Sequence, residues 1–208
     1  MLTTRAKPVK RAPRDPERTR THLLETAFTE IYRGGFQGTG LDRILDRAKV
    51  TKGALYHHFA SKEELGYAVV EEVIRNVTVQ KWVVPLAGSD HPLDALIGVI
   101  QATSLASADV ARGCPLNNLA QEMSPLDEGF RQRVADVFKL WFDAVTGALE
   151  EARKRGQIYS DINVNQSAMF IVAAYEGYMS LAKNAQDAEI LRAGIRTLTH
   201  YLESLRKN

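Results

Sequence analysis

Apolar side chains recur at three- and four-residue spacing along most of the chain, which is typical of amphipathic helices. The first such stretch predicts a helix over about residues 18–33, which the glycines of "RGGF" end. The apolar residues that define it are Leu23, Leu24, Ala27, Phe28, Ile31 and Tyr32. Two shorter helices follow, in "LDRILDRAK" and "KGALYHHF", and Thr51 is the expected N-cap of the second one. Ser61 and Glu64 form a capping box, so we expect a fourth helix from there to Pro85.

The rest of the chain keeps the helical period and has no alternating strand pattern. Proline and glycine residues mark the expected ends, such as Pro115 at a helix start and Gly156 after the basic "RKR". The sequence therefore predicts an all-α protein. The further helices are expected at about 91–108, 113–123, 126–154, 163–184 and 188–206.

Charge divides the chain into two parts. Residues 1–62 hold 13 of the 27 basic residues but only 6 of the 25 acidic ones. The net charge is therefore +7 in this part and −5 in the remainder, within a total of +2. A basic N-terminal third indicates that this part meets a polyanion. Its first 16 residues combine prolines with basic side chains, which predicts a disordered arm that could follow a DNA minor groove.

The two short helices, joined by "AKVT", predict a helix-turn-helix whose second helix enters a DNA major groove by its N-terminal end. That end carries Thr51, Lys52 and Gly53, with Tyr56 one turn further along the same face. A hydroxyl and free backbone amides bind phosphate, and a lysine reaches a phosphate or a guanine edge. Glycine lets the backbone approach the DNA closely. These residues are the expected core of a DNA-binding surface.

Two residues outside this helix complete the expected contacts. Thr39 is expected to cap the preceding helix against the DNA backbone, and Lys62 to contact a flanking phosphate. The domain organisation that follows is a disordered basic arm (1–16), a helix-turn-helix DNA-binding domain (17–62) and a helical ligand-binding and dimerisation domain (63–208).

The stretch "TRTHLLETAFTEIYRGGFQGTGLDRILDRAKVTKGALYHHFASKEEL" resembles the DNA-binding domain of TetR-family transcriptional regulators. Their signature is a glycine-phenylalanine turn, a short helix and then "V-[ST]-K-G-x-[LI]-Y-x-[HY]-F-x-[SG]-K-[ED]-x-L". One departure is Gly40, where many members have Thr or Val. The resemblance implies a homodimeric repressor in which helices one to three bind DNA, helix four links to a ligand domain and the last two helices dimerise. It also implies that His57 points to phosphate, while His58 packs with Phe59 into the small core.

Aromatic and methionine residues of the acidic part gather where a cavity for a small-molecule effector could form, although each of them could instead be plain core. These residues are Trp82, Met123, Phe138, Trp141, Tyr175, Tyr178 and Met179.

Cys114, the single cysteine, stands at an expected helix start with Arg112 nearby, an environment that favours a thiolate. Asn117 and Asn118 add polar groups to an otherwise apolar stretch. The "GC" here and "GYMSLAKNA" near the C-terminus are similar to the electrophile-sensing N-ethylmaleimide-type repressors of the same family. That similarity implies that Cys114 is a sensor and Lys183 its partner; the alternative is that Cys114 is a small buried hydrophobe.

The last two predicted helices are the expected dimer interface. "SAMFIVAAYEGYMSLA", in 163–184, is apolar nearly all round and must be covered on both sides, whereas 188–206 has an apolar stripe. Two such helices from each subunit form a four-helix interface. The alternative is that the stripe packs only inside its own chain. The stripe consists of Leu191, Ile195, Leu198, Leu202 and Leu205.

Other classes of protein find little support. No zinc-ligand spacing, phosphate-binding loop or dinucleotide fingerprint is present, and the adjacent His57 and His58 cannot face the same side of a helix as a metal pair. We therefore expect no catalysis, cofactor or metal. No apolar run reaches the roughly 18 residues of a membrane span, and no secretory signal is evident, so we expect a cytoplasmic protein.

The sequence therefore predicts a ligand-responsive repressor that binds a palindromic operator as a homodimer and is released by a small-molecule effector. A thiol-based sensor on the same scaffold is the alternative hypothesis, and an adaptor that binds a protein instead of DNA is the third. The +7 charge and the intact "TKGALYHHF" argue against the adaptor.

Overall fold

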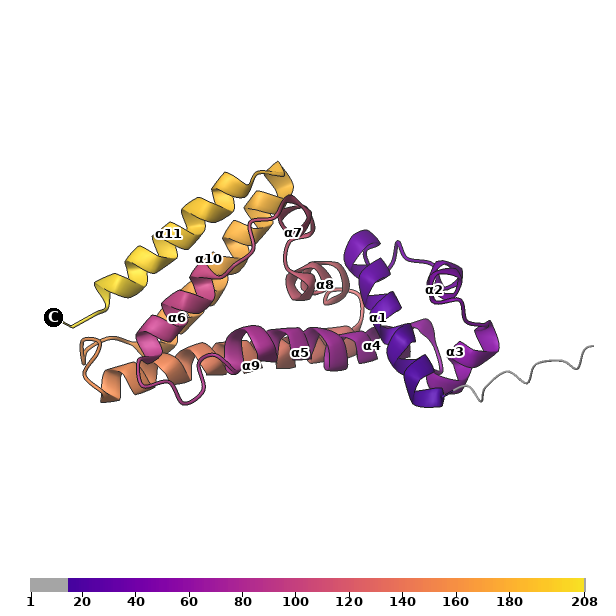
Figure 1. The fold of residues 1–208 in the computed structure, drawn as a ribbon, viewed down its shortest axis with the longest axis horizontal. Coiled ribbons are helices and arrows are strands. Elements are labelled where there is room, and N and C mark those ends of the chain that lie inside the picture. The colour runs from indigo at the N-terminus through magenta and orange to yellow at the C-terminus, as the bar shows by residue number, and fades with distance from the viewer. Residues whose placement is uncertain (1–14, 208) are drawn as a thin grey trace, which may run out of the picture.

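Helices make up most of residues 15–207, the part of the chain that the computed structural model describes (Figure 1). Within this range the only extended pairing is a single antiparallel bridge between Ile158 and Arg206. The predicted all-α fold class is confirmed. The predicted basic arm lies outside the described residues except for its last two positions, Asp15 and Pro16.

Three helices form the N-terminal end of the molecule: α1 (Pro16–Gly34), α2 (Leu41–Ala48) and α3 (Lys52–His58). Asp15 caps α1 with its carboxylate, and Gly35 ends α1 at a φ of 77°, a conformation that favours glycine. Thr51 caps α3 as predicted, because its hydroxyl accepts the backbone N–H of Ala54 at 3.2 Å. The apolar faces of the three helices pack together, and their buried residues are Leu23, Leu24, Ala27, Ile31, Ile44, Leu45, Ala48 and Leu55.

One continuous helical rod follows, made of α4 (Lys62–Ala68), η1 (Val69–Ile74), α5 (Arg75–Thr78) and η2 (Val79–Val83). Ser61 begins the rod by accepting the backbone N–H of Glu64 at 3.2 Å, as the capping box predicts. The segments η1 and η2 are π-helical, but the backbone stays helical where they begin, with φ −59° at both Val69 and Val79. The predicted fourth helix therefore forms as a single rod that leaves the N-terminal helices.

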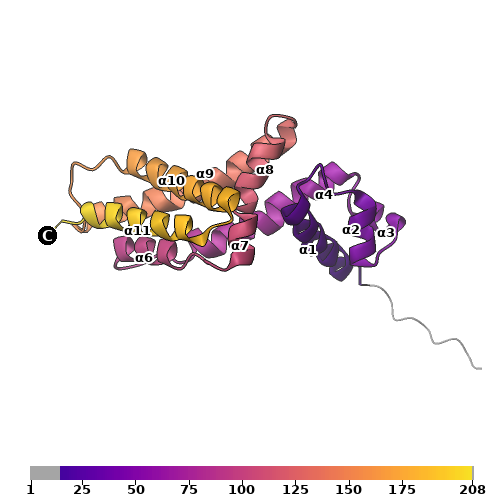
Figure 2. The ribbon, with the colours of Figure 1, turned by 90° about the horizontal axis from the view of Figure 1, so that it is seen from above.

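The remaining helices follow the rod along the chain: α6 (Pro92–Gln101), α7 (Ser107–Arg112), α8 (Pro115–Met123), α9 (Glu128–Lys154), α10 (Val164–Ala185) and α11 (Ala188–Ser204). The long α9 runs beside the rod, and α10 packs against both α9 and α11 (Figures 1 and 2). Helix α6 lies between α9 and α11. Helices α7 and α8 extend from this bundle toward α1.

The helix predicted over 91–108 is wrong in its second half. The chain leaves the helix after Gln101 and begins α7 only at Ser107. In between, Ser104 accepts the backbone N–H of Ala106 at 3.3 Å and donates to Asp109 at 2.7 Å. Hydroxyl groups that bond to nearby backbone in this way compete with the helix, which explains the break.

The N-terminal helices share one apolar core with α8 and the start of α9. Phe130 of α9 is fully buried, and its ring centroid lies 4.6 Å from that of Phe36, which precedes α2. Gly66 permits this approach, because a Cβ atom there would lie 2.5 Å from the Phe36 ring and 2.6 Å from the Phe130 ring. The helix-turn-helix is therefore packed directly against the second part of the chain.

None of the helices between Asp15 and Lys207 combines the length and the hydropathy that a membrane crossing requires.

Candidate nucleic-acid interface and ligand cavity

The exposed face of α3 carries most of the residues predicted to contact DNA. Leu55 is fully buried in the core and so fixes the orientation of α3, which leaves 47% of the Tyr56 surface exposed. Lys52 lies beside Tyr56, with its Nζ 5.9 Å from the ring centroid. A Cβ atom at Gly53 would meet nothing within 4 Å, so this side of the helix is open to close approach. The predicted residues that share this exposed surface are Thr51, Lys52, Gly53, Tyr56 and His57.

His58 differs from His57 as expected. It is half-buried, and its ring lies 6.4 Å from the buried ring of Phe59. Among the residues that the structure describes, no group of three or more His, Cys, Asp or Glu side chains could hold a metal ion.

A buried carboxylate, Glu30 of α1, organises the arginines beside α2. Its Oε2 lies 2.5 Å from Arg43 Nε, and its Oε1 lies 3.7 Å from Arg47 and 3.9 Å from Arg33. One carboxylate cannot neutralise three guanidinium groups, so the cluster keeps a net positive charge close to the helix-turn-helix. The sequence prediction missed Glu30, which looks like an ordinary polar residue of an amphipathic helix.

Two predicted DNA contacts need correction. Thr39 is fully buried, its hydroxyl donates to the backbone carbonyl of Gly35 at 2.7 Å, and the N-cap of α2 is Gly40. It therefore stabilises the α1–α2 turn and cannot reach DNA. The Nζ of Lys62 turns inward, donating to the carbonyl of Phe36 at 2.7 Å and lying 4.4 Å from the Phe36 ring. Its expected phosphate contact is replaced here by a contact with the same turn.

A cavity of about 200 Å³ lies between the helical rod, α9 and α10, next to the α7–α8 turn. Three aromatic rings form one wall: the Trp82 centroid lies 4.6 Å from that of Trp141 and 5.1 Å from that of Tyr175. All three residues are at least 97% buried in the fold, with exposures of 3%, 2% and 2%. Five of the predicted ligand residues line this cavity: Trp82, Cys114, Trp141, Tyr175 and Met179.

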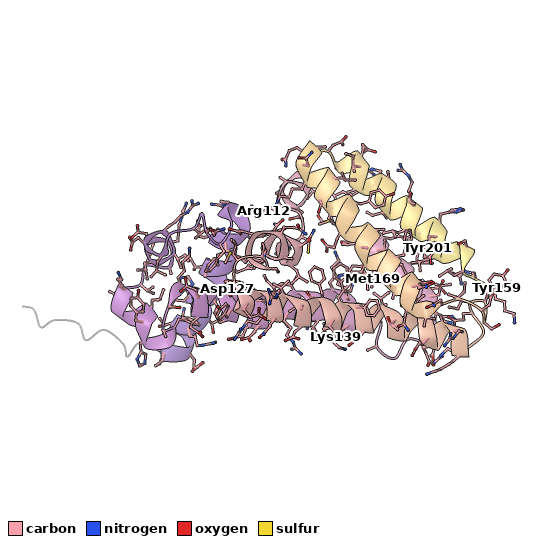
Figure 3. The ribbon with its side chains drawn as sticks, turned by 180° about the vertical axis from the view of Figure 1, so that it is seen from behind. Arg112, Asp127, Lys139, Tyr159, Met169 and Tyr201 are labelled. Carbon is pink, nitrogen blue, oxygen red and sulfur yellow. The ribbon has the colours of Figure 1, made fainter. Side chains whose placement is uncertain are left out.

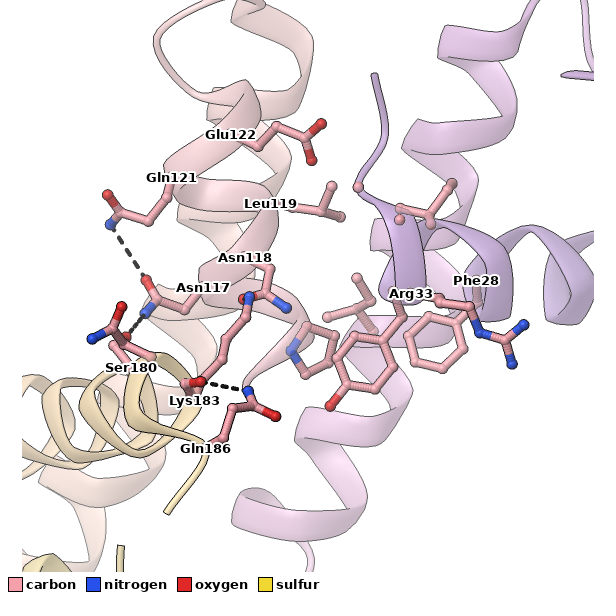
Figure 4. A pocket seen from close by; sticks show the side chains of 17 residues that line it. Phe28, Arg33, Asn117, Asn118, Leu119, Gln121, Glu122, Ser180, Lys183 and Gln186 are labelled. Atoms are coloured by element: carbon pink, nitrogen blue, oxygen red, sulfur yellow. Dashed lines mark hydrogen bonds between the residues drawn. The ribbon is translucent and has the colours of Figure 1, made fainter. Parts of the chain in front are cut away.

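A second, larger hollow of about 670 Å³ lies between α1, α8 and α10 (Figure 4). Three predicted ligand residues line it instead of the first cavity: Asn117, Asn118 and Lys183. The Lys183 Nζ donates to the Asn118 side chain at 2.7 Å, and Asn117 donates to Ser180 at 3.0 Å. These pairs connect α8 to α10. Lys183 therefore pairs with Asn118, and its predicted partnership with Cys114 is wrong.

Two further predicted ligand residues line none of the described cavities. Phe138 stacks on the outside of Trp141, with ring centroids 6.3 Å apart. Tyr178 faces α11, where a Cβ atom at Gly194 would lie 2.2 Å from its ring. Helical period alone could not tell these packing positions from cavity positions, since all lie on apolar faces. Met123 is likewise a core residue, packed with the N-terminal helices.

The first cavity also has a polar end that the sequence prediction missed. Lys81 of η2 donates a hydrogen bond to the hydroxyl of Tyr175, which lies 3.0 Å from the hydroxyl of Thr103. Glu176 of α10 brings a carboxyl group to the same cavity. A glutamate inside the apolar run "FIVAAYEGYM" was the available signal, because a buried acid in such a run needs a reason.

The structure favours a protonated thiol at Cys114 over the predicted thiolate. Cys114 stands at the N-cap of α8, and the backbone N–H groups of Asn117 and Leu116 do lower its pKa. Burial acts more strongly in the opposite direction, and the neighbouring Glu176 adds to it, so the pKa of the thiol is raised well above its ordinary value. The helix-start effect is present but is outweighed, and Cys114 stays a thiol in the cavity wall.

The segment around Cys114 also contacts the N-terminal helices. The hydroxyl of Tyr32 on α1 donates to the carbonyl of Gly113, and burial raises the Tyr32 pKa to about 12. Glu122, two turns along α8, accepts backbone N–H groups of Phe36 and Gln37, each at 2.8 Å. Helix α8 thus touches the cavity at its start and the helix-turn-helix at its end.

Helix α10 leaves large apolar side chains uncovered. The exposed fractions are 58% for Met169, 47% for Phe170 and 58% for Leu181. Met169 and Tyr201, from adjacent helices, are labelled in Figure 3, and the Phe170 ring packs edge-on against Tyr201 at 4.7 Å. The apolar side chains of 163–184 therefore remain partly unpartnered within one chain, whereas Leu191, Leu198, Leu202 and Leu205 of the α11 stripe are buried inside it.

Family comparisons agree with this architecture. Residues 23–69 match the family described as bacterial regulatory proteins, tetR family. Residues 92–198 match the family described as tetracyclin repressor-like, C-terminal domain. The two matches cover the helix-turn-helix and most of the second part of the chain.

Individual proteins with similar sequences are regulators. The chain is 28% identical over 199 residues to the transcriptional regulator AcuR of Cereibacter sphaeroides, covering 92% of this chain and 90% of that protein. It is 31% identical over 185 residues to the A-factor receptor protein of Streptomyces griseus, covering 88% of this chain and 62% of that protein. It is 26% identical to the reduced form of Escherichia coli NemR in a crystal structure, with a TM-score of 0.80 and coverage of 91% and 97%.

Proposed function

Because the chain belongs to the TetR family of bacterial transcriptional regulators, we propose that it is a repressor that binds a palindromic operator as a homodimer and is released by a small-molecule effector. The members of this family are regulators and in general are not enzymes.

The observation that carries this proposal is the exposed end of α3. Lys52, Gly53 and Tyr56 lie together on a helix whose buried side is fixed by Leu55. A helix held in this way can enter a major groove as a rigid element and place side chains at base edges. The basic cluster around Glu30 supports the proposal, since phosphate contacts supply much of the affinity for DNA.

The test is binding of the full-length protein to genomic fragments, measured by gel shift at physiological salt. We expect a small subset of fragments to bind, with a footprint of two half-sites related by twofold symmetry. Binding to every fragment alike, or to none, would contradict the proposal. Capture of a protein in place of DNA would support the adaptor hypothesis.

The homodimer part of the proposal rests on α10. A monomer seldom exposes several large apolar side chains on one helix without a partner. A second copy of the same face could cover Met169, Phe170 and Leu181, since a twofold interface brings each patch against its own copy.

The release mechanism that we propose uses the cavity and two connections from it. The rod leads from Trp82 to the recognition helix, and α8 leads from Cys114 to the α1–α2 turn. An effector lowers DNA affinity only if it binds more tightly to the conformation that does not bind DNA. Covalent sensing through Cys114 is not part of the proposal, because the raised pKa disfavours the reactive thiolate.

A further inference from the structure

Glu176 presents to the cavity a carboxyl group that the rest of the fold leaves without a partner. Only 8% of the residue is exposed, and within residues 15–207 neither carboxyl oxygen has a hydrogen-bond partner. A buried polar group in this state costs free energy unless another molecule satisfies it. Because Glu176 lines the cavity, a ligand bound there can supply the missing hydrogen bond.

The side chains next to Glu176 do not supply the missing hydrogen bonds. Burial raises the pKa of Glu176 to about 7. Cys114, Asn117 and the charge of Lys81 act in the opposite direction but do not cancel this effect. A thiol is a weak hydrogen-bond donor, and the Asn117 amide donates to Ser180 but makes no hydrogen bond to either Glu176 oxygen within the described residues. The carboxyl group therefore still needs a hydrogen-bond donor, which a ligand in the cavity can supply.

Lys81 is the complementary group at the same cavity. Its Nζ donates to the Tyr175 hydroxyl and lies 4.8 Å from the Tyr175 centroid and 5.4 Å from the Trp82 centroid. Within the described residues, no carboxylate oxygen lies within 4.0 Å of the Lys81 Nζ. The ammonium group is thus held in place by neutral groups and lacks an anion.

The size of the cavity limits the ligand. At about 200 Å³ it is smaller than the roughly 300–1,000 Å³ of sites for drug-sized molecules. It would hold about seven molecules of liquid water by volume. The rings of Trp82 and Trp141 make the wall between the polar groups apolar. A ligand must therefore be short, with polar groups at its ends.

We propose, building on the proposed effector site, that the ligand is a small carboxylic acid that also carries a hydroxyl or amino group. Its carboxylate pairs with Lys81 and accepts from the hydroxyls of Tyr175 or Thr103. Its hydroxyl or amino group donates to Glu176. This arrangement gives the carboxyl group its donor and the ammonium group its anion in a single binding event.

Other small ligands satisfy only part of the site. An apolar molecule provides neither a hydrogen-bond donor for Glu176 nor an anion for Lys81. A simple amine places a second cation near Lys81. A dicarboxylate brings an anion against Glu176. A diol supplies a donor but no anion for Lys81.

The experiment uses the full-length protein without DNA and follows tryptophan fluorescence, because the chain has two tryptophans and both line the cavity. The probes are glycolate, 3-hydroxypropionate and 4-hydroxybutyrate, with glycine, 3-aminopropionate and 4-aminobutyrate as their amino counterparts. Acetate, propionate and butyrate lack the donor, and the matching diols lack the carboxylate. We expect at least one two-ended acid to bind tenfold or more tightly than both controls of its length. The hydroxy and amino series show which donor is preferred.

The inference is overturned if a simple acid or a diol binds as tightly as the best two-ended acid. It is also overturned if no two-ended acid binds. In the variants Glu176→Gln and Lys81→Met we expect at least tenfold weaker binding of the best probe. Glu150→Gln and Lys139→Met, both on α9 outside the cavity, are the matched controls and should bind it like the wild type. Unchanged binding in both cavity variants contradicts the assignment.

Melting curves separate a folding defect from a lost contact, because a folded variant that fails to bind the probe reports on the contact alone. The result is also separable from the proposed function. If the protein binds operator fragments but none of the acids, only the proposed ligand class is wrong. If it binds an acid but no DNA, the proposed repressor function is wrong.

Discussion

The carboxylate of Glu122 on α8 accepts the backbone N–H of Phe36 at 2.8 Å and so joins α8 to the turn before α2. The same turn receives Lys62 from the start of the rod, through the Phe36 carbonyl. Both routes from the cavity toward the helix-turn-helix therefore converge on Phe36. Under the proposed release mechanism, a movement of α8 relative to the rod would shift Phe36 and so connect the effector cavity to α2 and α3.

We expect Glu122→Ala to weaken this coupling. The variant loses two charge-assisted hydrogen bonds to backbone, each worth about 1.5–3 kcal/mol when fully formed, and less here because Glu122 is partly exposed. The ratio of operator affinities without and with effector should fall, as measured by fluorescence anisotropy. Gln121→Ala, one residue earlier on the exposed side of α8, should leave the ratio unchanged. An equal ratio in wild type and Glu122→Ala would remove α8 from the release pathway.

Removing a side chain from the exposed face of α3 should weaken operator binding. Lys52→Ala or Tyr56→Ala is expected to cost about 1–3 kcal/mol if the side chain reads a base edge, and to relax sequence preference at that position. Binding titrations at one fixed salt concentration measure this. Lys139→Ala on α9 is the control for the loss of one positive charge. Wild-type affinity in both α3 variants would mean that another surface meets the DNA.

The sequence was most informative where short-range chemistry decides the structure. The caps at Thr51 and Ser61 and the apolar period predicted the helix-turn-helix and the rod almost to the residue. The predicted exposure of Tyr56 agrees with the structure, in which the neighbouring Leu55 is buried and Tyr56 is 47% exposed.

Long-range relationships could not be predicted in this way. Glu30, Lys81 and Glu176 each depend on partners or on a cavity supplied by distant segments. Thr39 looked like a helix cap, but its hydroxyl found closer carbonyl groups in the α1–α2 turn. The aromatic residues Phe138 and Trp141 lie one turn apart on α9, and only the packing of α10 and the rod decides which one faces the cavity.

Cys114 should react slowly with alkylating reagents in the folded protein. Burial and Glu176 raise its pKa, so little thiolate is present near neutral pH. At pH 8 we expect iodoacetamide to label the native protein at least tenfold more slowly than the protein in urea, as followed by mass spectrometry. Labelling at the same rate in both would mean that the α7–α8 turn opens readily. Glu176→Gln tests the cause, and it should increase the native rate.

The exposed face of α10 should be required for dimer formation. A charge in the centre of an apolar interface is strongly unfavourable, because it loses water without gaining a partner. We therefore expect Leu181→Asp or Met169→Asp to convert a dimer into a monomer at micromolar concentration, as judged by light scattering. Ala135→Asp, on the exposed side of α9, is the matched control and should stay dimeric. A dimer that survives both α10 substitutions must use a different face.

Glu176 should make the protein less stable as the pH rises. Burial raises its pKa in the folded protein to about 7, from an ordinary value of 4.5, so the unfolded chain loses this proton first. The stability that the protonated group contributes is complete below about pH 4.5 and is lost as the pH rises through about 7. The groups that face it are Lys81 from η2 and Cys114 and Asn117 at the start of α8; Lys81 opposes the rise in pKa but does not cancel it. Since a tenfold change in an ionisation constant corresponds to about 1.4 kcal/mol, the full effect on the free energy of unfolding is about 3 kcal/mol.

Urea unfolding at pH 5, 6, 7 and 8, at one protein concentration, measures this effect. The free energy of unfolding of Glu176→Gln relative to wild type should increase from pH 5 to about pH 7 and level off by pH 8, and Glu150→Gln should show no such trend. A difference that stays constant with pH would show that Glu176 has found a partner in solution.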